Sequence, residues 1–427
     1  MKVVFLTAGA AGMYCGSCMH DNAIARSLRA NGVDCVLQPI YTPIRTDSTS
    51  VARHQIFFGG IHVYLLQQWP WMRWVPKSAR RLLDWPPLIR LATRRAASTD
   101  PAKLGELAIS MLQGVDGRQA EEVLRLTAWL QQEMQPDVLV LSNLLIGGSL
   151  PLIHQRLPKT KVFVMLQGDD IFLDHLPESA RAQAIALLSG LVQSVDRFLV
   201  NSRFYADKMG LLLNIPDEKI CRVPLSIDLA PYQSKPKAKG ATTSFRLGYL
   251  ARISPEKGLH RLVDAFLHLA VKAEHQDMTL EVAGWLGEAN RPYLEAIQSR
   301  IREAGLQDRF TYHGSPLLPE KIVFLQSLDL LCVPTEYEDP KGLFALEAMA
   351  CGVPVLLPDH GAFGELIEST GGGIVVPPND HQALADGIER LKRDPLLRES
   401  LATQATVNLR EKHSIESTGR LLRNLFP

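Results

Sequence analysis

The sequence predicts two α/β domains, each built on a parallel sheet with helices on both faces. Three observations predict this class: a length of 427 residues, an apolar fraction of 46%, and short apolar runs that alternate with amphipathic stretches. A chain of this length exceeds one ordinary core and suits two domains of roughly 200 residues. Continuous apolar runs separated by helical segments are typical of buried parallel strands. We therefore expect two doubly wound domains with a ligand in the crevice between them.

Strand-length apolar runs continue from one end of the chain to the other. The predicted strands of the first domain are Val3–Thr7, Cys35–Gln38, His62–Leu66, Val138–Leu141, Lys161–Leu166 and Arg197–Val200. Those of the second domain are Arg246–Leu250, Thr279–Val282, Phe310–Tyr312, Leu328–Val333, Val355–Leu357 and Ile374–Val376. Between the strands lie amphipathic stretches such as Ala120–Met134 and Ala180–Ser194.

Composition changes mark the domain boundaries. Residues 234–244 are small, polar and basic, which is typical of a linker. We therefore predict a first domain over 1–233 and a second over 245–412. The last segment, 413–427, is predicted to form a helix that crosses back to the first domain.

Overall composition excludes several classes of function. A net charge of +1 does not supply the broad basic face that nucleic-acid binding needs. Six cysteines in so long a chain do not form a disulfide scaffold and are expected to be small core side chains. No segment approaches the roughly 20 apolar residues that span a bilayer, and Val3–Thr7 is better explained as a buried strand than as a signal peptide. We expect a cytoplasmic protein.

Two cations follow the first predicted strand of the second domain. Arg252 and Lys257 flank Ser254-Pro255, a pair typical of a helix start with serine as the N-cap. Both cations would then lie at the carboxyl end of a strand beside a helix N-terminus, where a pyrophosphate group binds favourably. The alternative is that both are solvated surface charges.

A second block combines acids with a glycine and an apolar helix. Asp339 and Glu347 are eight positions apart, one in a loop and one in the following helix. Glu347 lies among apolar residues, where a charge is costly unless a polar group pairs with it. Glu338, next to Asp339, is an equally acidic candidate for the loop position.

These two blocks resemble the signatures of glycosyltransferase family 4, whose members are retaining enzymes of the GT-B fold with two Rossmann-like domains facing a central cleft. The resemblance implies transfer of a sugar from a nucleoside-diphosphate sugar to an acceptor that the sequence does not identify. It implies that Arg252 and Lys257 bind the donor phosphates, so that no cofactor and no metal is needed.

The same resemblance assigns further site residues. Asp339, with Glu338 as the alternative, would face the donor sugar, and Glu347 would accept hydrogen bonds from the ribose hydroxyls. Gly342 and Leu343 would offer backbone N–H groups near the donor phosphate. The other donor- or substrate-binding positions implied are Gly12, Gly16, Gln167, Asp169, Gly284 and His313.

The chain also departs from the family pattern. Gln167 stands where the family often has histidine, Ser226 replaces an expected glycine, and Pro340-Lys341 replaces Gly-Phe. Glutamine cannot titrate, which excludes acid–base work at position 167. These departures leave open a catalytically decayed sugar-nucleotide-binding protein. A sugar-nucleotide epimerase or a phosphorylase on the same fold is a further alternative.

Two other features have an open role. Cys15 and Cys18 form a single Cys-x-x-Cys pair, which is weak support for redox chemistry or zinc and is better explained as packing of a tight loop. An insertion at about 67–100 holds four of the six tryptophans together with many arginines. Residues 69–95 of it are a candidate for peripheral contact with an anionic membrane, for covering an acceptor, or for burial against the first domain.

Overall fold

The computed structural model describes residues 1–9, 16–44, 46, 49–53, 56–57, 101–233 and 244–427. Several predicted features lie outside these residues: the strand His62–Leu66, the insertion, residues 234–243 of the linker, Gly12 and Cys15. The chain divides into two compact units: unit 1 comprises Met1–Val223 and Thr418–Pro427, and unit 2 comprises Pro224–Ser417. Unit 2 thus begins before the predicted boundary at residue 233.

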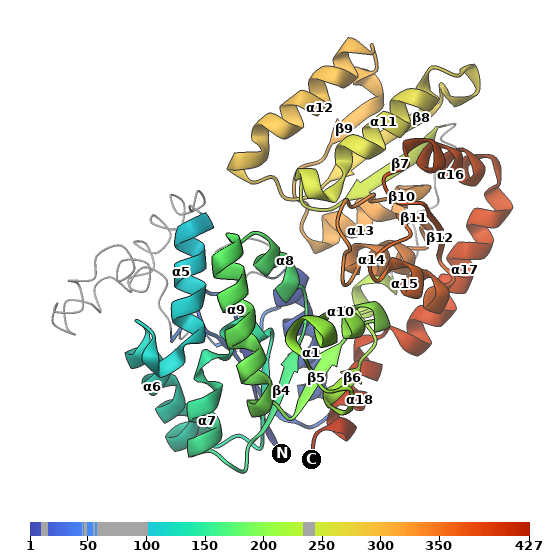
Figure 1. The fold of residues 1–427 in the computed structure, drawn as a ribbon. Helices are drawn as coiled ribbons and strands as arrows, with labels where there is room; N and C mark the ends of the chain where they lie inside the picture. The colour runs from blue at the N-terminus through green and yellow to red at the C-terminus, as the bar shows by residue number, and fades with distance from the viewer. Residues whose placement is uncertain (10–15, 45, 47–48, 54–55, 58–100, 234–243) are drawn as a thin grey trace. The chain divides into compact units, whose positions relative to one another are not determined.

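Unit 1 is built on a sheet of six parallel strands in the order β2-β1-β3-β4-β5-β6 (Figure 1). The strands are β1 (Lys2–Thr7), β2 (Asp34–Pro39), β3 (Val138–Leu141), β4 (Lys161–Met165), β5 (Arg197–Val200) and β6 (Ile220–Arg222). The sequence predicts the first five to within two residues at each end. It misses β6, since this strand has three residues and none of them is fully buried.

The helices of unit 1 cover both faces of this sheet, as a parallel sheet requires. They are α1 (Gly16–Ala30), α5 (Pro101–Leu112), α6 (Ala120–Trp129), α7 (Leu150–Arg156), α8 (Asp169–Asp174), α9 (Glu178–Leu191) and α10 (Arg203–Leu213). Short turns are η3 (Gly114–Asp116), η4 (Leu130–Met134), η5 (Leu144–Ser149), η6 (Val192–Ser194) and η7 (Asp217–Lys219). The two predicted amphipathic stretches are α6 with η4 and α9 with η6.

Unit 2 holds a second sheet of six parallel strands, in the order β12-β11-β10-β7-β8-β9. The strands are β7 (Phe245–Leu250), β8 (Met278–Ala283), β9 (Phe310–Tyr312), β10 (Leu330–Cys332), β11 (Val355–Pro358) and β12 (Gly373–Val376). All six predicted strands are confirmed. The strand order reverses between β7 and β10, and ligands of open α/β sheets bind at such a switch point, outside the carboxyl ends of the strands.

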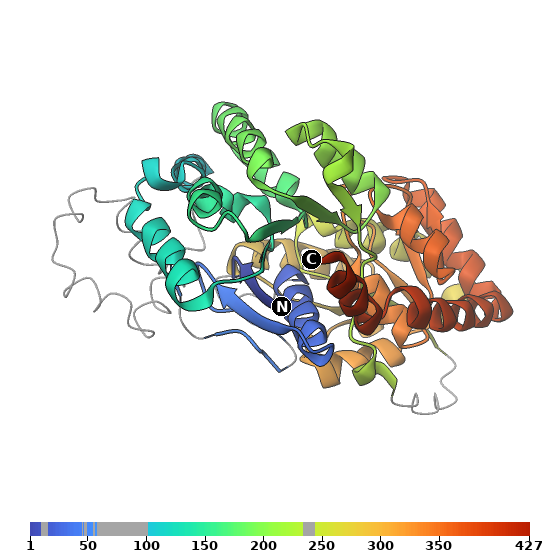
Figure 2. The ribbon, with the colours of Figure 1, turned by 90° about the horizontal axis from the view of Figure 1, so that it is seen from below.

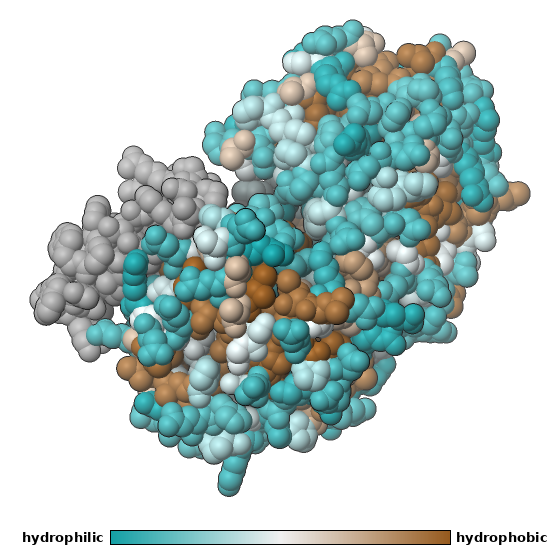
Figure 3. Space-filling model, viewed as in Figure 1, coloured by the Kyte–Doolittle hydropathy of each residue, from teal (hydrophilic) through white to brown (hydrophobic). Residues whose placement is uncertain are grey.

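The helices of unit 2 are amphipathic where they cover the sheet. They are α11 (Leu259–Ala270), α12 (Arg291–Glu303), α13 (Leu318–Gln326), α14 (Leu343–Ala350), α15 (Phe363–Thr370), α16 (His381–Arg393) and α17 (Pro395–Lys412). Short turns are η8 (Ala230–Gln233), η9 (Pro255–Lys257), η10 (Ala273–His275), η11 (Glu288–Asn290) and η12 (Gln307–Arg309). On α11, Leu259, Leu262 and Phe266 are fully buried. In Figure 3, hydrophilic side chains cover most of the visible surface of the part that holds α11 and α12.

The last helix, α18 (Ile415–Leu425), carries the chain back into unit 1. Phe426 packs against Phe163 of β4 with ring centroids 4.9 Å apart, and Gly419 lies against Ser27 of α1. Both termini are therefore in unit 1, where Figures 1 and 2 draw them close together. Within the described residues, no helix combines the length and the apolar character needed to cross a membrane.

Candidate active site

The turn after β7 differs from the sequence prediction. Ser254 does not cap a long helix: it precedes the short turn η9, and its side chain makes no capping hydrogen bond. Gly258 then adopts a left-handed conformation (φ +72°), and α11 begins only after it. A Cβ atom at Gly258 would lie 1.7 Å from the carbonyl oxygen of Pro334, so only glycine lets this turn pack on the loop after β10. This contact brings the two loops at the switch point together.

Lys257 and Asp339, which the sequence analysis identified from two separate motifs, form an ion pair where these two loops meet. The Lys257 ammonium lies 2.7 Å from Oδ2 of Asp339, and both side chains are almost completely buried. Tyr337 completes the cluster: its hydroxyl donates to Asp339 Oδ2 at 2.9 Å, and Lys257 Nζ donates to the same hydroxyl. The backbone N–H of Lys341 donates to Asp339 Oδ1 at 3.0 Å. Sequence reasoning missed Tyr337, because a tyrosine in an acidic loop carries no distinctive spacing signal.

The electrostatics of this cluster fix its charge state. Burial alone would raise the pKa of Asp339, but the Lys257 charge and the hydrogen bonds from Lys257, Lys341 and Tyr337 lower it to about 2. Burial and the neighbouring Asp339 carboxylate raise the pKa of Tyr337 well above its usual value, so the phenol stays neutral. The cluster therefore presents a fixed cation beside a fixed carboxylate at the carboxyl edge of the sheet.

Arg252 and Glu338 lie at the margin of this arrangement. Arg252 is about half exposed and pairs with Glu256, four positions further along the chain, at 3.4 Å. Glu338 is exposed, whereas Asp339 is buried against Lys257. The arrangement favours Asp339 over Glu338 as the acid of the site, and the role of Arg252 in phosphate binding stays a prediction.

Glu347 has a counter-ion that the sequence analysis did not identify. Helix α14 begins after Gly342, which has φ +87° and lies against the ring of Phe363. From this helix, Glu347 Oε1 accepts hydrogen bonds from Lys321 Nζ at 2.6 Å and from the Tyr232 hydroxyl at 3.3 Å. Lys321 lies on α13 and is only 8% exposed. The pair explains how a carboxylate is tolerated among apolar residues.

Two further predicted positions lie at the ends of β8 and β9. Gly284 has φ +146°, and a Cβ atom there would lie 1.7 Å from the carbonyl oxygen of Ala251. The close approach at this glycine is thus to the end of β7. His313 follows β9, and its Nε2 lies 2.7 Å from Oε2 of Glu281. Contact of His313 with a nucleobase stays a prediction.

A buried polar cluster occupies the corresponding edge of the unit 1 sheet. Gln167, after β4, donates through Nε2 to Asp21 Oδ1 at 2.9 Å and to the Ser142 carbonyl at 3.0 Å. Its Oε1 lies 3.3 Å from Nδ1 of His20 on α1, which Gly16 opens. The Gln167 amide is therefore held by three neighbours. His20 lies beside position 167, where glycosyltransferase family 4 often has a histidine. Sequence reasoning missed His20 and Asp21, since 146 positions separate Asp21 from Gln167.

Asp169 lies next to this cluster and is completely buried. It accepts hydrogen bonds from the backbone N–H groups of Leu144, at 2.8 Å, and of Gln167, at 3.1 Å. Burial nevertheless raises the pKa of Asp169 from 3.8 to about 6, against these hydrogen bonds. Its main role in the structure is to hold two backbone segments together.

The raised pKa of Asp169 predicts a pH dependence of stability. The folded state holds this proton more tightly than the unfolded chain, so stability is greatest below pH 3.8 and falls as the pH rises towards about 6. In Asp169→Asn this pH dependence of the free energy of unfolding should disappear. The free energy that the wild type loses over this pH range, and the variant does not, is on the order of 2–3 kcal/mol. Urea unfolding from pH 4 to 7 measures it. Asp174→Asn, an exposed acid on the same helix, is the control, and parallel profiles for Asp169→Asn and wild type would contradict the assignment.

Comparison with known sequences gives a family match over part of the chain. Residues 233–407 match the model of a family described as glycosyl transferases group 1. The chain is similar to alpha-D-kanosaminyltransferase of Streptomyces kanamyceticus, with 31% identity over 52% of this chain and 57% of that one. It is similar to D-inositol 3-phosphate glycosyltransferase of an Arthrobacter strain, with 26% identity over 61% of each chain. The chain thus spans about six-tenths of the length of these relatives.

Solved structures match the whole chain in fold. Sucrose-phosphate synthase of Thermosynechococcus elongatus has a TM-score of 0.72 and 16% identity, over 100% of this chain and 98% of that one. Anabaena HepE in complex with UDP has a TM-score of 0.68 and 17% identity, over 100% and 99%. The predicted GT-B fold class, with two parallel-sheet α/β domains, is confirmed by these matches.

Proposed function

We propose that the protein is a retaining glycosyltransferase that moves a sugar from a nucleoside-diphosphate sugar to an acceptor hydroxyl without a metal ion. The observation that carries the proposal is the buried Lys257–Asp339 pair at the switch point of the unit 2 sheet. The match of residues 233–407 to the model of glycosyl transferases group 1 supports the transferase class. In the cluster of Lys257, Asp339 and Tyr337, the fixed positive charge of Lys257 is of the kind that the departure of a nucleoside diphosphate requires.

Lys257 is the group that stabilises the leaving diphosphate in this proposal. An ammonium group has three N–H donors, and Lys257 directs two of them at Asp339 and Tyr337. The third is left to bind a phosphate oxygen. Because Asp339 and Tyr337 already fix the ammonium, little reorganisation is needed when charge develops on the departing phosphate, and such preorganised electrostatics is often the largest contribution to catalysis.

Asp339 and Glu347 define the remaining contacts with the donor. Asp339 carries the negative charge that a sugar hydroxyl binds, and its ionised form is secured by Lys257. Glu347 is 13% exposed and already accepts two hydrogen bonds on Oε1. We propose that Oε2 accepts the ribose hydroxyls. Structures of HepE contain UDP and UDP-glucose, which makes uridine the first base to test.

Calorimetric titration tests the proposal and identifies the donor. Wild type and Arg252→Ala/Lys257→Ala are titrated with UDP-, GDP- and ADP-sugars in the presence of a chelator. We expect saturable binding of one donor, reduced at least roughly tenfold in the double variant, since hydrogen bonds to charged groups contribute about 1.5–3 kcal/mol. Arg302→Ala, at an exposed arginine on α12, is the control. Equal donor binding by wild type and the double variant would refute the phosphate clamp.

A second candidate, a sugar-nucleotide-binding protein that has lost transfer activity, is motivated by Gln167. Its amide is tied to Asp21, Ser142 and His20, and it cannot exchange protons. Such a protein would bind the donor as wild type does but release no nucleotide when offered acceptors. Turnover of the donor to free nucleotide, with glycosylated acceptor or with water, distinguishes the two.

A further inference from the structure

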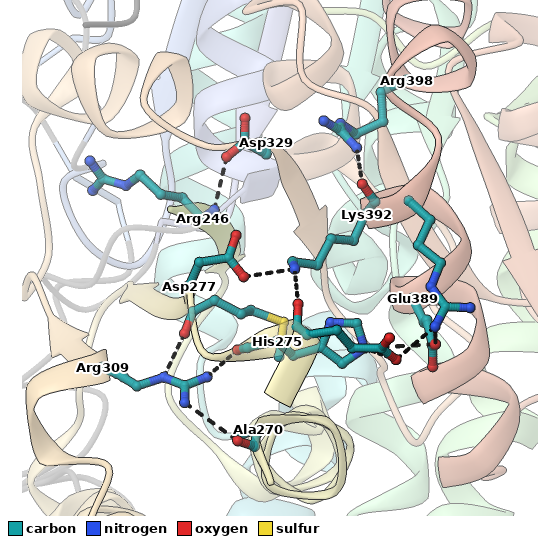
Figure 4. Close-up of polar contacts among 12 residues, drawn as sticks. Arg246, Ala270, His275, Asp277, Arg309, Asp329, Glu389, Lys392 and Arg398 are labelled. Carbon is teal, nitrogen blue, oxygen red and sulfur yellow. Dashed lines mark hydrogen bonds and ion pairs between the residues drawn. The ribbon is translucent and has the colours of Figure 1, made fainter. Parts of the chain in front are cut away.

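A second charged cluster lies at the opposite edge of the unit 2 sheet. Turn η10 immediately precedes β8, and α16 ends at Arg393, so both lie away from the carboxyl edge that carries Lys257 and Asp339. Glu274 and His275 of η10 face Glu389 of α16, and one ligand atom from each lies within 4.8 Å of the others. Figure 4 shows His275 and Glu389 side by side. The residues come from positions more than a hundred apart, which is why no metal-ligand spacing appears in the sequence.

His275 is the unusual member of this cluster. Its side chain is 1% exposed, and among the described residues neither ring nitrogen has a hydrogen-bond partner. A buried imidazole without hydrogen bonds is costly and calls for an explanation. Its Nε2 is directed at the two acids, 3.7 Å from Oε1 of Glu274 and 3.7 Å from Oε1 of Glu389. Burial, and then the nearby Lys392, lower the pKa of His275.

The distances fit the ligand shell of a small divalent cation. Nitrogen and oxygen ligands lie roughly 2.0–2.2 Å from Zn²⁺ in a tetrahedral site, which separates the ligand atoms by roughly 3.3–3.6 Å. The observed 3.7 Å from Nε2 to each carboxylate oxygen exceeds this by little. Imidazole nitrogen with carboxylate oxygen is a ligand set that zinc accepts, and three protein ligands leave a fourth position for water.

The guanidinium group of Arg393 occupies the position between the carboxylates of Glu274 and Glu389. A single nitrogen, Nη2 of Arg393, lies 2.6 Å from Oε1 of Glu274 and 2.6 Å from Oε1 of Glu389. These are the two oxygens that His275 Nε2 faces. Arg393 is 59% exposed, and exposed ion pairs contribute little to stability. Its side chain can therefore swing into solvent at small cost.

The other cations of the cluster do not occupy this position. Lys272 lies 2.9 Å from Oε2 of Glu389, whereas Arg393 and His275 approach Oε1. Lys392 reaches Oδ1 of Asp277 at 2.7 Å, as Figure 4 shows, and the Glu274 carbonyl at 2.8 Å. With Arg393 displaced, the two carboxylates face one lysine and keep a net negative charge, which favours binding of a cation.

We propose that His275, Glu274 and Glu389 form a binding site for a divalent transition metal of the zinc type, with Arg393 as a displaceable internal cation. The bound ion would clip η10 to the end of α16 in unit 2. The site is separate from the sugar-transfer chemistry, because it lies at the amino edge of the sheet. It is therefore compatible with metal-independent transfer.

Titration of the chelator-treated full-length protein with Zn²⁺ tests the site. We expect one ion per chain in the wild type and at least roughly tenfold weaker binding in His275→Gln, since loss of a ligand or its support typically costs 10–100-fold. Arg393→Gln should change zinc affinity in the opposite direction. Removal of the internal cation should strengthen zinc binding roughly tenfold relative to wild type. His381→Gln removes an exposed histidine from the other end of α16 and should bind as wild type does.

The two variants make the proposal refutable even if one fails to fold. Circular dichroism checks the fold of His275→Gln, and Arg393→Gln alters only an exposed side chain. Absence of saturable zinc binding in Arg393→Gln, or unchanged binding in a folded His275→Gln, would show that the cluster is only an ion-pair network. Donor binding at the Lys257 site is measured in parallel, so failure here is distinguishable from failure of the proposed function.

Discussion

Replacing Lys257 with methionine is expected to abolish transfer almost completely and to destabilise unit 2. The ammonium is the only cation paired with Asp339 in the described structure, and its loss leaves a carboxylate buried without a counter-ion. Breaking such a pair from one side typically costs about 3–5 kcal/mol. Loss of a preorganised group that stabilises developing charge typically lowers kcat by about 10²–10³-fold. Urea unfolding and donor turnover measure the two effects separately.

A second substitution separates stability from catalysis. In Lys257→Met/Asp339→Asn neither charge remains, so most of the lost stability should return while transfer stays absent. Lys321→Met does not touch this cluster, and its turnover should exceed that of Lys257→Met by at least about tenfold. If the single and double variants were equally unstable, the ion pair would not be the source of the effect.

The pH dependence of this pair has a defined sign. The folded pKa of Asp339, about 2, lies below the unfolded value of 3.8. The stability that the pair contributes is therefore fully present above pH 3.8 and is lost as the pH falls through about 2. Without Lys257, burial dominates and the carboxyl protonates more easily. The destabilisation of Lys257→Met should thus shrink as the pH is lowered from 7 towards 4.

The sheets were predictable from the sequence, and the motifs that hold the candidate site residues were visible in it, because both depend on local patterns. A buried parallel strand is a continuous apolar run, so all six strands of unit 2 were found. The sequence also identified Lys257 and Asp339, each from its own motif. Their direct pairing was not predictable, because 82 positions separate them and the pairing depends on contacts between two distant loops, such as that of Gly258 with Pro334.

Partners supplied by other elements were missed for the same reason. Lys321 lies on α13, where the sequence pattern predicts an ordinary polar residue of an amphipathic helix, yet it is buried against Glu347. The helix start at Ser254 was wrong, since the sequence pair Ser-Pro fits a short turn as well as a long helix. Gly258 determines where the turn ends and α11 begins, and its left-handed conformation depends on the loop that it contacts.

Replacing Glu347 with alanine is expected to remove recognition of the ribose while leaving the rest of the donor site in place. If Oε2 binds the ribose hydroxyls, the wild type should prefer the nucleoside diphosphate over its 2′-deoxy analogue by about 10–100-fold, the range of a hydrogen bond to a charged group. Glu347→Ala should bind both analogues equally and weakly. Calorimetry with the two analogues measures this ratio, and a ratio unchanged by the substitution would place the ribose elsewhere.

Lys321 tests whether Glu347 must be held in place to act. Lys321→Met leaves the Tyr232 hydroxyl as the partner of Glu347 Oε1 among the hydrogen bonds described above, so the carboxylate can rotate away from the ribose. We expect weaker donor binding and a smaller preference for the ribose form than in the wild type. In the Glu347→Ala background the same substitution should change neither quantity, because a positioning residue has no effect once the group that it positions is gone. Additive losses in the double variant would instead mean that Lys321 contacts the donor itself.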